Sequence, residues 1–155
     1  MTDKELMQKA IELSLENIAN EGGPFGAVIA KNGEIISTGV NRVTATNDPT
    51  AHAEVNAIRS AAALLGTFDL SGCVIFTSCE PCPMCLGAIY WAHIDKIFFA
   101  NTKKDAKSIG FDDSFIYDEM SLPLNERKIP TKPMMREKAI KAFLEWDEKS
   151  DKQTY

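Results

Sequence analysis

The sequence is poor in the features that mark membrane, repeat and nucleic-acid-binding proteins. It has no apolar run near the roughly 20 residues that a membrane-spanning helix needs, no internal repeat and no low-complexity segment. Positive charge is also scarce, because 17 Lys and Arg residues stand against 22 Asp and Glu residues, for a formal net charge of −5. Phosphate contacts supply most of the non-specific affinity for nucleic acids. This acidic balance therefore favours a small molecule as the partner, with no nucleic acid and no membrane.

The composition that remains is that of an ordinary globular domain. Hydrophobic residues make up 45% of the 155 residues and charged residues 25%, a balance typical of folded proteins. A chain of this length can bury a core without disulfides. The first residues, Met1 to Glu5, are too polar for a secretory signal. We expect a single cytoplasmic domain over residues 1–155.

Helical and extended patterns alternate along the chain. Thr2 and Glu5 have the spacing of a capping box at a helix start, and Asn32-Gly33 favours a tight hairpin turn between two strands. We expect helices at 1–21, 48–65, 83–92, 115–119 and 133–148, and strands at 25–31, 34–40, 73–78 and 96–100. Strands that alternate with helices after a first hairpin predict an α/β sandwich with a mixed sheet.

Metal-ligating side chains are few and clustered, since the chain has only two histidines and four cysteines. His52 opens the segment His-Ala-Glu, and Cys82 and Cys85 are three residues apart at an expected strand-to-helix junction. On a helix this spacing puts both cysteines on one face, where they can bind one ion. Each piece alone also fits an ordinary surface histidine or a buried or redox-active cysteine pair. Cys79 has the same spacing from Cys82 and is an alternative ligand or a small buried residue.

One histidine and two cysteines leave tetrahedral zinc with one open position, which is the mark of a catalytic site. A water at such a position has its pKa lowered to roughly 7. Glu54 lies two residues after His52 and is suited to take a proton from that water. His93 lies beyond the apolar helix face and is a weaker candidate ligand. We therefore expect Zn²⁺ bound by His52, Cys82 and Cys85, with Glu54 as the catalytic acid and base.

These motifs resemble the signature of zinc-dependent nucleobase deaminases, H-x-E followed by P-C-x-x-C. The resemblance to the cytidine deaminase-like superfamily covers nearly the whole chain and rests on Gly22–Val28, Asn47–Glu54 and Thr77–Trp91. More narrowly, Gly110–Tyr117 and Tyr155 resemble the bacterial guanine deaminases of that superfamily. The zinc motifs are common to the superfamily and do not identify the base that is deaminated.

The resemblance implies a three-layer α/β/α sandwich with a mixed five-stranded sheet. It implies hydrolysis of guanine to xanthine and ammonia, with attack at C2 of the ring. By motif position, Asn41 would bind the purine edge, Phe25 and Trp91 would form aromatic walls, and Ala53 would contact the substrate. Asp113 would accept hydrogen bonds from the guanine amino and ring N–H groups and would carry a second proton.

In bacterial members of this family, the C-terminal segment is exchanged between two subunits. The resemblance therefore implies a homodimer in which residues 133–155, a helix and a tail, are exchanged and Tyr155 reaches the active site of the partner. Without the resemblance, a polar tail such as 147–153 is expected to be solvated.

Three other functions remain open on the residues alone. A tRNA adenosine deaminase shares the zinc motifs, but the last helix mixes acidic and basic residues instead of presenting a basic face. A deaminase of cytosine or of another small base or nucleoside is opposed only by the Asp112-Asp113 segment. A non-enzymatic zinc-stabilised domain would need a fourth ligand, for which only Cys79 is at hand, and would leave Glu54 without a task.

Overall fold

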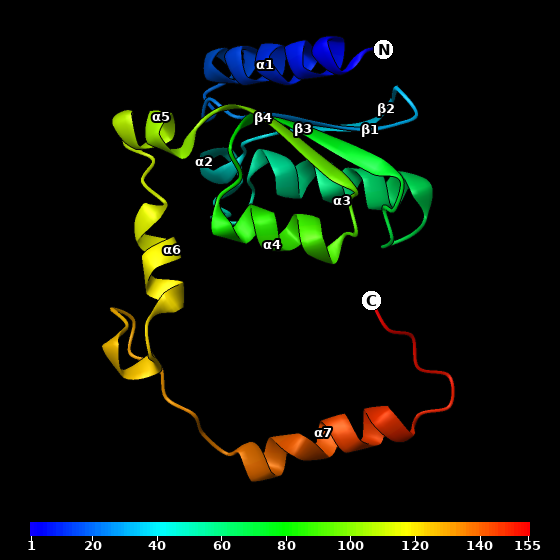
Figure 1. Cartoon of the computed structure of the whole chain (residues 1–155), viewed down its shortest axis with the longest axis vertical. Helices are drawn as coiled ribbons and strands as arrows, with labels where there is room; N and C mark the ends of the chain where they lie inside the picture. Colours follow the sequence, from blue (N-terminus) through cyan, green and yellow to red (C-terminus); the bar gives the residue numbers. More distant parts are fainter. The chain divides into compact units, whose positions relative to one another are not determined.

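The computed structural model describes all 155 residues, which form two compact units, Met1–Ser114 and Phe115–Tyr155 (Figure 1). The strands are β1 (Gly26–Lys31), β2 (Glu34–Val40), β3 (Cys73–Cys79) and β4 (Lys96–Asn101). The helices of the first unit are α1 (Asp3–Ala19), α2 (Val43–Thr46), α3 (Ala53–Leu65), α4 (Pro83–Trp91) and α5 (Lys103–Ser108). The second unit holds most of α6 (Ser114–Ser121), the 3-10 helix η1 (Leu124–Glu126) and α7 (Arg136–Glu148).

The sheet is mixed and has four strands in the order β2-β1-β3-β4. β1 runs antiparallel to both β2 and β3, whereas β3 and β4 are parallel. The expectation of five strands is therefore wrong for this structure. After β4 the chain turns into α5, which starts with a capping box between Thr102 and Asp105, and no later segment adds a strand.

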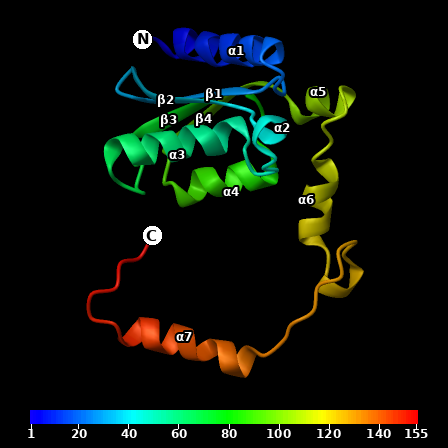
Figure 2. The ribbon, with the colours of Figure 1, turned by 180° about the vertical axis from the view of Figure 1, so that it is seen from behind.

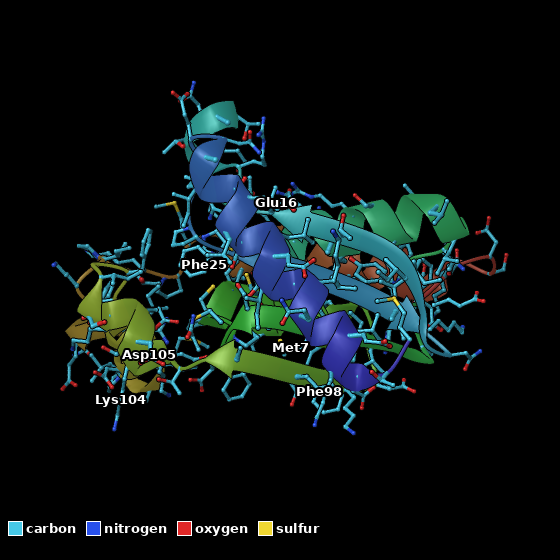
Figure 3. The ribbon with its side chains drawn as sticks, turned by 90° about the horizontal axis from the view of Figure 1, so that it is seen from above. Met7, Glu16, Phe25, Phe98, Lys104 and Asp105 are labelled. Atoms are coloured by element: carbon cyan, nitrogen blue, oxygen red, sulfur yellow. The ribbon has the colours of Figure 1, made fainter.

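Helices cover both faces of the sheet, which gives the expected α/β/α layers. α1 packs on one face, where Leu6 and Ala10 meet Val28 and Phe76. Figure 3 looks onto this face, with Met7 on α1 and Phe98 on β4 labelled. α3 and α4 lie side by side against the other face (Figures 1 and 2). Strand alternation explains the division, because successive residues of β3 point to opposite faces.

The predicted hairpin between β1 and β2 is confirmed. Asn32 and Gly33 have positive φ angles of 52° and 78°, the backbone that the tight turn requires. The register runs from Lys31 opposite Glu34 to Gly26 opposite Val40. The two ends of the hairpin therefore meet at the same edge.

The start of α3 differs from the expectation of a helix that begins at Asp48-Pro49. Asp48 Oδ1 instead accepts hydrogen bonds from the backbone N–H and the hydroxyl of Thr50, at 2.8 Å and 2.7 Å. This local turn uses the side chain that would have capped a helix. α3 begins at Ala53, with His52 at its N-cap. The short helices α2 and α5 were not expected.

Gly39 of β2 sets how closely α3 approaches the sheet. A Cβ atom at Gly39 would lie 2.1 Å from the carbonyl oxygen of Ala53 and 2.6 Å from the backbone nitrogen of Ala57. Both distances are far inside van der Waals contact, so only glycine fits. The first turn of α3 therefore lies directly on the backbone of β2.

The second unit presents much apolar surface. Phe143 and Leu144 of α7 are 74% and 58% exposed, and Ile129 and Met134 are more exposed still. A folded monomer seldom leaves so many large apolar side chains in water. No helix in the chain has the length and apolar character needed to span a bilayer.

Candidate metal centre and catalytic site

Two helix N-termini bring the predicted metal ligands together. His52 is the N-cap of α3, and Cys82 is the N-cap of α4, where Pro83 occupies the first turn. Proline suits that position because its missing N–H would have no helical partner. The backbone N–H of Cys85 lies 3.5 Å from Cys82 Sγ. Both cysteines are thus fixed within one turn of α4, opposite the first turn of α3.

The three side chains have the spacing that a zinc ion requires. His52 Nδ1 lies 3.5 Å from Cys82 Sγ and 3.4 Å from Cys85 Sγ, and the three ligand atoms lie within 4.8 Å of one another. Zinc bonds of about 2.3 Å to sulfur and about 2.0 Å to nitrogen, in tetrahedral geometry, put such atoms about 3.6 Å apart. The donor set and its geometry therefore fit Zn²⁺ with a fourth position left for a non-protein ligand.

Cys79 and His93 lie outside this cluster. Cys79 Sγ is instead 3.8 Å from the carbonyl oxygen of Thr102, and burial raises the pKa of its thiol to about 11. A cysteine that stays protonated is a poor metal ligand. Of the two C-x-x-C pairs in the sequence, the structure brings only Cys82 and Cys85 to His52.

The surroundings of Cys82 favour its thiolate. Hydrogen bonds from Cys85 and then from His52 lower the pKa of Cys82 to about 4, against the opposing effect of burial. The hydrogen bond to Cys82 in turn raises the pKa of His52. The N-terminal end of α4 also favours negative charge. A thiolate next to a second thiol is ready to bind a cation, which replaces the shared proton.

Glu54 lies in the first turn of α3 and is buried, with 7% of its surface exposed. Thr77 Oγ1 of β3 donates a hydrogen bond to Glu54 Oε1 over 3.2 Å. Burial raises the pKa of the Glu54 carboxyl, because the charged form loses its hydration. A buried carboxylate with a raised pKa is suited to take and return protons near neutral pH.

Asn41 follows β2 directly, and its carbonyl end is held by the chain. Asn41 Oδ1 accepts a hydrogen bond from the backbone N–H of Val43 over 3.2 Å. Asn17 Nδ2 donates to the backbone carbonyls of both Asn41 and Gly23. This arrangement identifies Nδ2 of Asn41 as the donor that the side chain can offer to a ligand. Asn17 was not singled out from the sequence, where it looks like any polar residue of α1.

An aromatic pair and a carboxylate lie in the same unit. Phe25 and Phe111 meet edge to face, with ring centroids 5.0 Å apart. Phe111 was not expected as a site residue, although it lies in the segment that resembles guanine deaminases. Asp113 Oδ1 is buried without a hydrogen-bond partner, and burial raises the pKa of Asp113. The charge of Cys82 adds to this effect, which links Asp113 to the metal cluster.

Three further predicted residues are placed as follows. Ala53 is fully buried at the start of α3. Trp91 is the last residue of α4 and is 65% exposed; it lies about 9 Å along the helix axis from Cys85. Tyr155 belongs to the second unit and is 72% exposed. The roles of these residues in substrate binding stay predictions.

Comparison with known proteins agrees with this geometry. Residues 1–101 match the protein family described as the cytidine and deoxycytidylate deaminase zinc-binding region. Guanine deaminase of Bacillus subtilis is 49% identical over 156 aligned residues, which cover 100% of both chains. Its crystal structure superposes with a TM-score of 0.96 and covers 100% of this chain and 99% of that one.

Two further relatives share the deaminase part of the chain. A protein solved in complex with 2,6-diaminopurine is 40% identical, with a TM-score of 0.68 over 70% of this chain and 61% of that chain. A tRNA-specific adenosine deaminase of Aquifex aeolicus is 46% identical over 81 residues, or 52% of this chain and 54% of its own. The chain therefore belongs to the cytidine and deoxycytidylate deaminase family, whose zinc-binding region it carries, and is a homologue of guanine deaminase.

Proposed function

We propose that the protein catalyses the zinc-dependent hydrolytic deamination of guanine to xanthine and ammonia. The observation that carries the proposal is the cluster of His52, Cys82 and Cys85 beside a buried Glu54. Three protein ligands and an adjacent acid–base group distinguish a catalytic zinc site from a structural one. The choice of guanine is supported by the likeness to guanine deaminase over the full length of the chain.

When bound, zinc supplies an open coordination position and makes a water acidic enough to attack near neutral pH. Glu54 accepts the proton from that water and delivers protons to the purine ring and to the departing amine. The burial of Glu54 keeps bulk water away from the carboxyl during these transfers. One water is consumed for each guanine, and ammonia leaves as the C2–N bond breaks.

The groups near the cluster match the edges of a purine base. Guanine carries N–H donors on its N1/N2 edge, and the buried Asp113 Oδ1 is an acceptor. Asn41 Nδ2 can donate to an acceptor of the ring, while the faces of Phe25 and Phe111 suit a flat aromatic ligand. In the proposed reaction Asp113 also carries the second proton. These contacts explain how one site would favour guanine over bases with another donor pattern.

The second unit is proposed to complete the domain through exchange between two copies. The exposed Phe143 and Leu144 of α7 need a partner surface, and a second copy of the chain would provide it. In this dimer residues 133–155 cross to the partner, and Tyr155 covers its active site. The four free cysteines fit a reducing compartment, which supports the proposal that the protein works in the cytoplasm.

Ammonia release from a panel of bases tests the reaction. The zinc-loaded protein is expected to release ammonia from guanine in preference to cytosine, cytidine, adenine, adenosine and a tRNA anticodon stem-loop. Glu54→Gln is the matched control, because it keeps the size of the side chain but removes the base. Its turnover should fall by about 10⁴-fold or more, the upper end of the range for general acid–base catalysis, while zinc content stays near one equivalent. Preferred turnover of the RNA or of cytosine would overturn the assignment of the base.

Mixed dimers test the exchange. Deletion of Thr154 and Tyr155 should lower activity with little change in zinc content or thermal midpoint. A dimer of one Glu54→Gln chain and one tail-deleted chain should regain one working site of two, because the tail-deleted chain keeps Glu54 and receives a complete tail. A mixed dimer without activity, or a monomer by sedimentation, would contradict the exchange.

A further inference from the structure

Thr77 is the one side chain whose hydroxyl is hydrogen-bonded to Glu54. Its Oγ1 lies 3.2 Å from Glu54 Oε1 and 3.0 Å from the carbonyl oxygen of Cys79. Thr77 is 2% exposed, so water does not compete for this contact. A hydroxyl has one proton to donate. The charged carboxylate is the stronger acceptor of the two.

The strand explains why this residue faces the site. Ile75 belongs to the core under α3 and α4, whereas Phe76 belongs to the core under α1. Because side chains alternate along a strand, Thr77 shares the face of Ile75. Thr77 lies five residues before Cys82, on β3, a central strand that pairs with both β1 and β4. Thr77 is thus fixed by the sheet, while Glu54 is carried by α3.

The zinc-bound state makes the contact with Thr77 more important. Burial raises the pKa of the Glu54 carboxyl, and the neighbouring Cys85 thiol acts in the opposite direction as a possible donor. A cysteine that binds zinc does so as a thiolate and has no proton to donate. The Thr77 hydroxyl is then the remaining side-chain donor to this carboxylate. The Cys79 carbonyl gives the same hydroxyl an alternative acceptor whenever Glu54 carries a proton.

We propose that Thr77 is a positioning residue that holds Glu54 Oε1 and thereby orients the other carboxylate oxygen toward the reacting water. The proposal rests on the proposed deaminase function and deepens it. Thr77 is not among the proposed zinc or substrate ligands and acts only through Glu54. Such a residue should affect kcat much more than KM, because the orientation of the base is needed in the transition state and not for substrate binding.

Thr77→Val and Thr77→Ser test the hydroxyl. Valine keeps the branched shape without the donor, and serine keeps the donor without the methyl group. With guanine, Thr77→Val should lower kcat by about 10²-fold, the order expected for a misplaced catalytic group, with KM within about twofold and zinc near one equivalent. Thr77→Ser should recover most of the rate, and Thr38→Val, an exposed strand threonine on β2, should behave as wild type.

A second measurement does not depend on turnover. The thermal midpoints of the zinc-loaded proteins are compared for Thr77→Val, Glu54→Ala and the double variant. If the hydroxyl and the carboxylate interact, the double variant should lose less than the sum of the two single losses. The pair Thr38→Val and Glu54→Ala should be additive. This cycle keeps its meaning even if wild type fails to deaminate guanine, an outcome that would sink the proposed function alone.

Three kinds of result would overturn the role of Thr77. One is a Thr77→Val protein with kcat within about threefold of wild type, the size of an indirect effect. Another is a Thr77→Ser protein as slow as Thr77→Val, or a zinc content that falls together with kcat, either of which assigns a structural role. The third is additivity of the Thr77 and Glu54 losses in thermal midpoint.

Discussion

The Asn17 side chain donates a hydrogen bond from Nδ2 to the backbone carbonyl of Asn41 over 2.9 Å. The same nitrogen donates to the carbonyl of Gly23 over 2.8 Å. Gly23 precedes β1 and Asn41 follows β2, so one buried amide of α1 joins the two ends of the hairpin. A helix on one face of the sheet thus fixes the segments that carry Phe25 and Asn41.

Asn17→Ala is expected to leave the buried backbone carbonyl of Asn41 without its donor, while the carbonyl of Gly23 keeps the backbone N–H of Phe25 as a donor. The free energy of unfolding should fall by about 1–3 kcal/mol, and kcat/KM for guanine should fall as Asn41 loses its fixed position. Urea unfolding and steady-state kinetics measure the two effects. Gln8→Ala, on the exposed face of α1, is the control and should change neither quantity. An unchanged kcat/KM in Asn17→Ala would show that the hydrogen bonds of Asn17 are not needed to position Asn41 for the substrate.

Zinc content is expected to depend on Cys82 and Cys85 but not on Cys79. Cys82→Ala and Cys85→Ala each remove one of three protein ligands, so the purified proteins should contain far less than one equivalent of zinc. Cys79→Ala is the matched control, since its thiol contacts Thr102 and not His52. Zinc analysis by mass spectrometry decides the matter. If Cys79→Ala lost as much zinc as the other two variants, the assignment of Cys82 and Cys85 as the only cysteine ligands would be wrong.

The Cys79 thiol should resist alkylation until the pH is high. Burial places its pKa at about 11, above the ordinary value of 9.0. Iodoacetamide, which reacts with the thiolate, should therefore label Cys79 slowly at pH 8 in the native protein and quickly in urea, as followed by peptide mass spectrometry. Equal rates in the two states would show that the thiol is not buried.

The raised pKa of the Cys79 thiol also makes the stability of the protein depend on pH. The folded protein holds the Cys79 proton more tightly than the unfolded chain, so this contribution to stability is complete below pH 9.0 and is lost as the pH rises toward about 11. Cys79→Ala should lose less stability than wild type between these two values. If the stability of Cys79→Ala fell more steeply with pH than that of wild type, the Cys79 pKa would not be raised by folding.

Asp113→Asn is expected to lower kcat/KM for guanine strongly. The change replaces a buried acceptor by an amide that presents donors to the N1/N2 edge, and such mismatches in a buried site discriminate by up to about 10⁴-fold. Asp112→Asn is the control, because Asp112 is exposed, bonded to Ser114 and paired with Lys107. Equal activity of the two variants would remove Asp113 from substrate recognition.

Gly39→Ala is expected to destabilise the protein and to disturb the site together. The added methyl would meet the backbone of α3 at Ala53 and Ala57, and a backbone cannot move aside as a flexible side chain can. The loss in unfolding free energy should be at least about 1–3 kcal/mol. Gly87→Ala on α4 is the control, since nothing lies within 4 Å of its added Cβ. Zinc affinity unaffected in Gly39→Ala would show that α3 shifts without moving His52.

Local patterns in the sequence predicted the parts of the fold that local physics decides. The turn at Asn32-Gly33, the bounds of β2 and the first turn of α4 at Pro83 follow from residues close in sequence. The start of α3 was missed because Asp48 has two uses, and its own turn with Thr50 prevailed over helix capping. The fifth strand was expected from family resemblance alone, and no segment in the structure supplies it.

Some residues of the candidate site could likewise be predicted from the sequence, and others could not. His52, Cys82 and Cys85 could be predicted from spacing, because a metal imposes a ligand pattern on the sequence. Glu54 was predicted from its position two residues after His52. Thr77 and Asn17 have no such pattern. Their importance comes from contacts over 23 and 24 residues of chain, which only the folded structure reveals.

The convergence of two helix N-caps on one point also bears on protein engineering. The largest influences that lower the pKa of Cys82 come from Cys85, from His52 and from a backbone N–H, and not from a lysine or arginine. Dipoles and hydrogen bonds of this kind lie inside the protein, where dissolved salt screens them little. The surface charge of the molecule could therefore be redesigned for solubility, immobilisation or fusion to a charged carrier without retuning the metal centre.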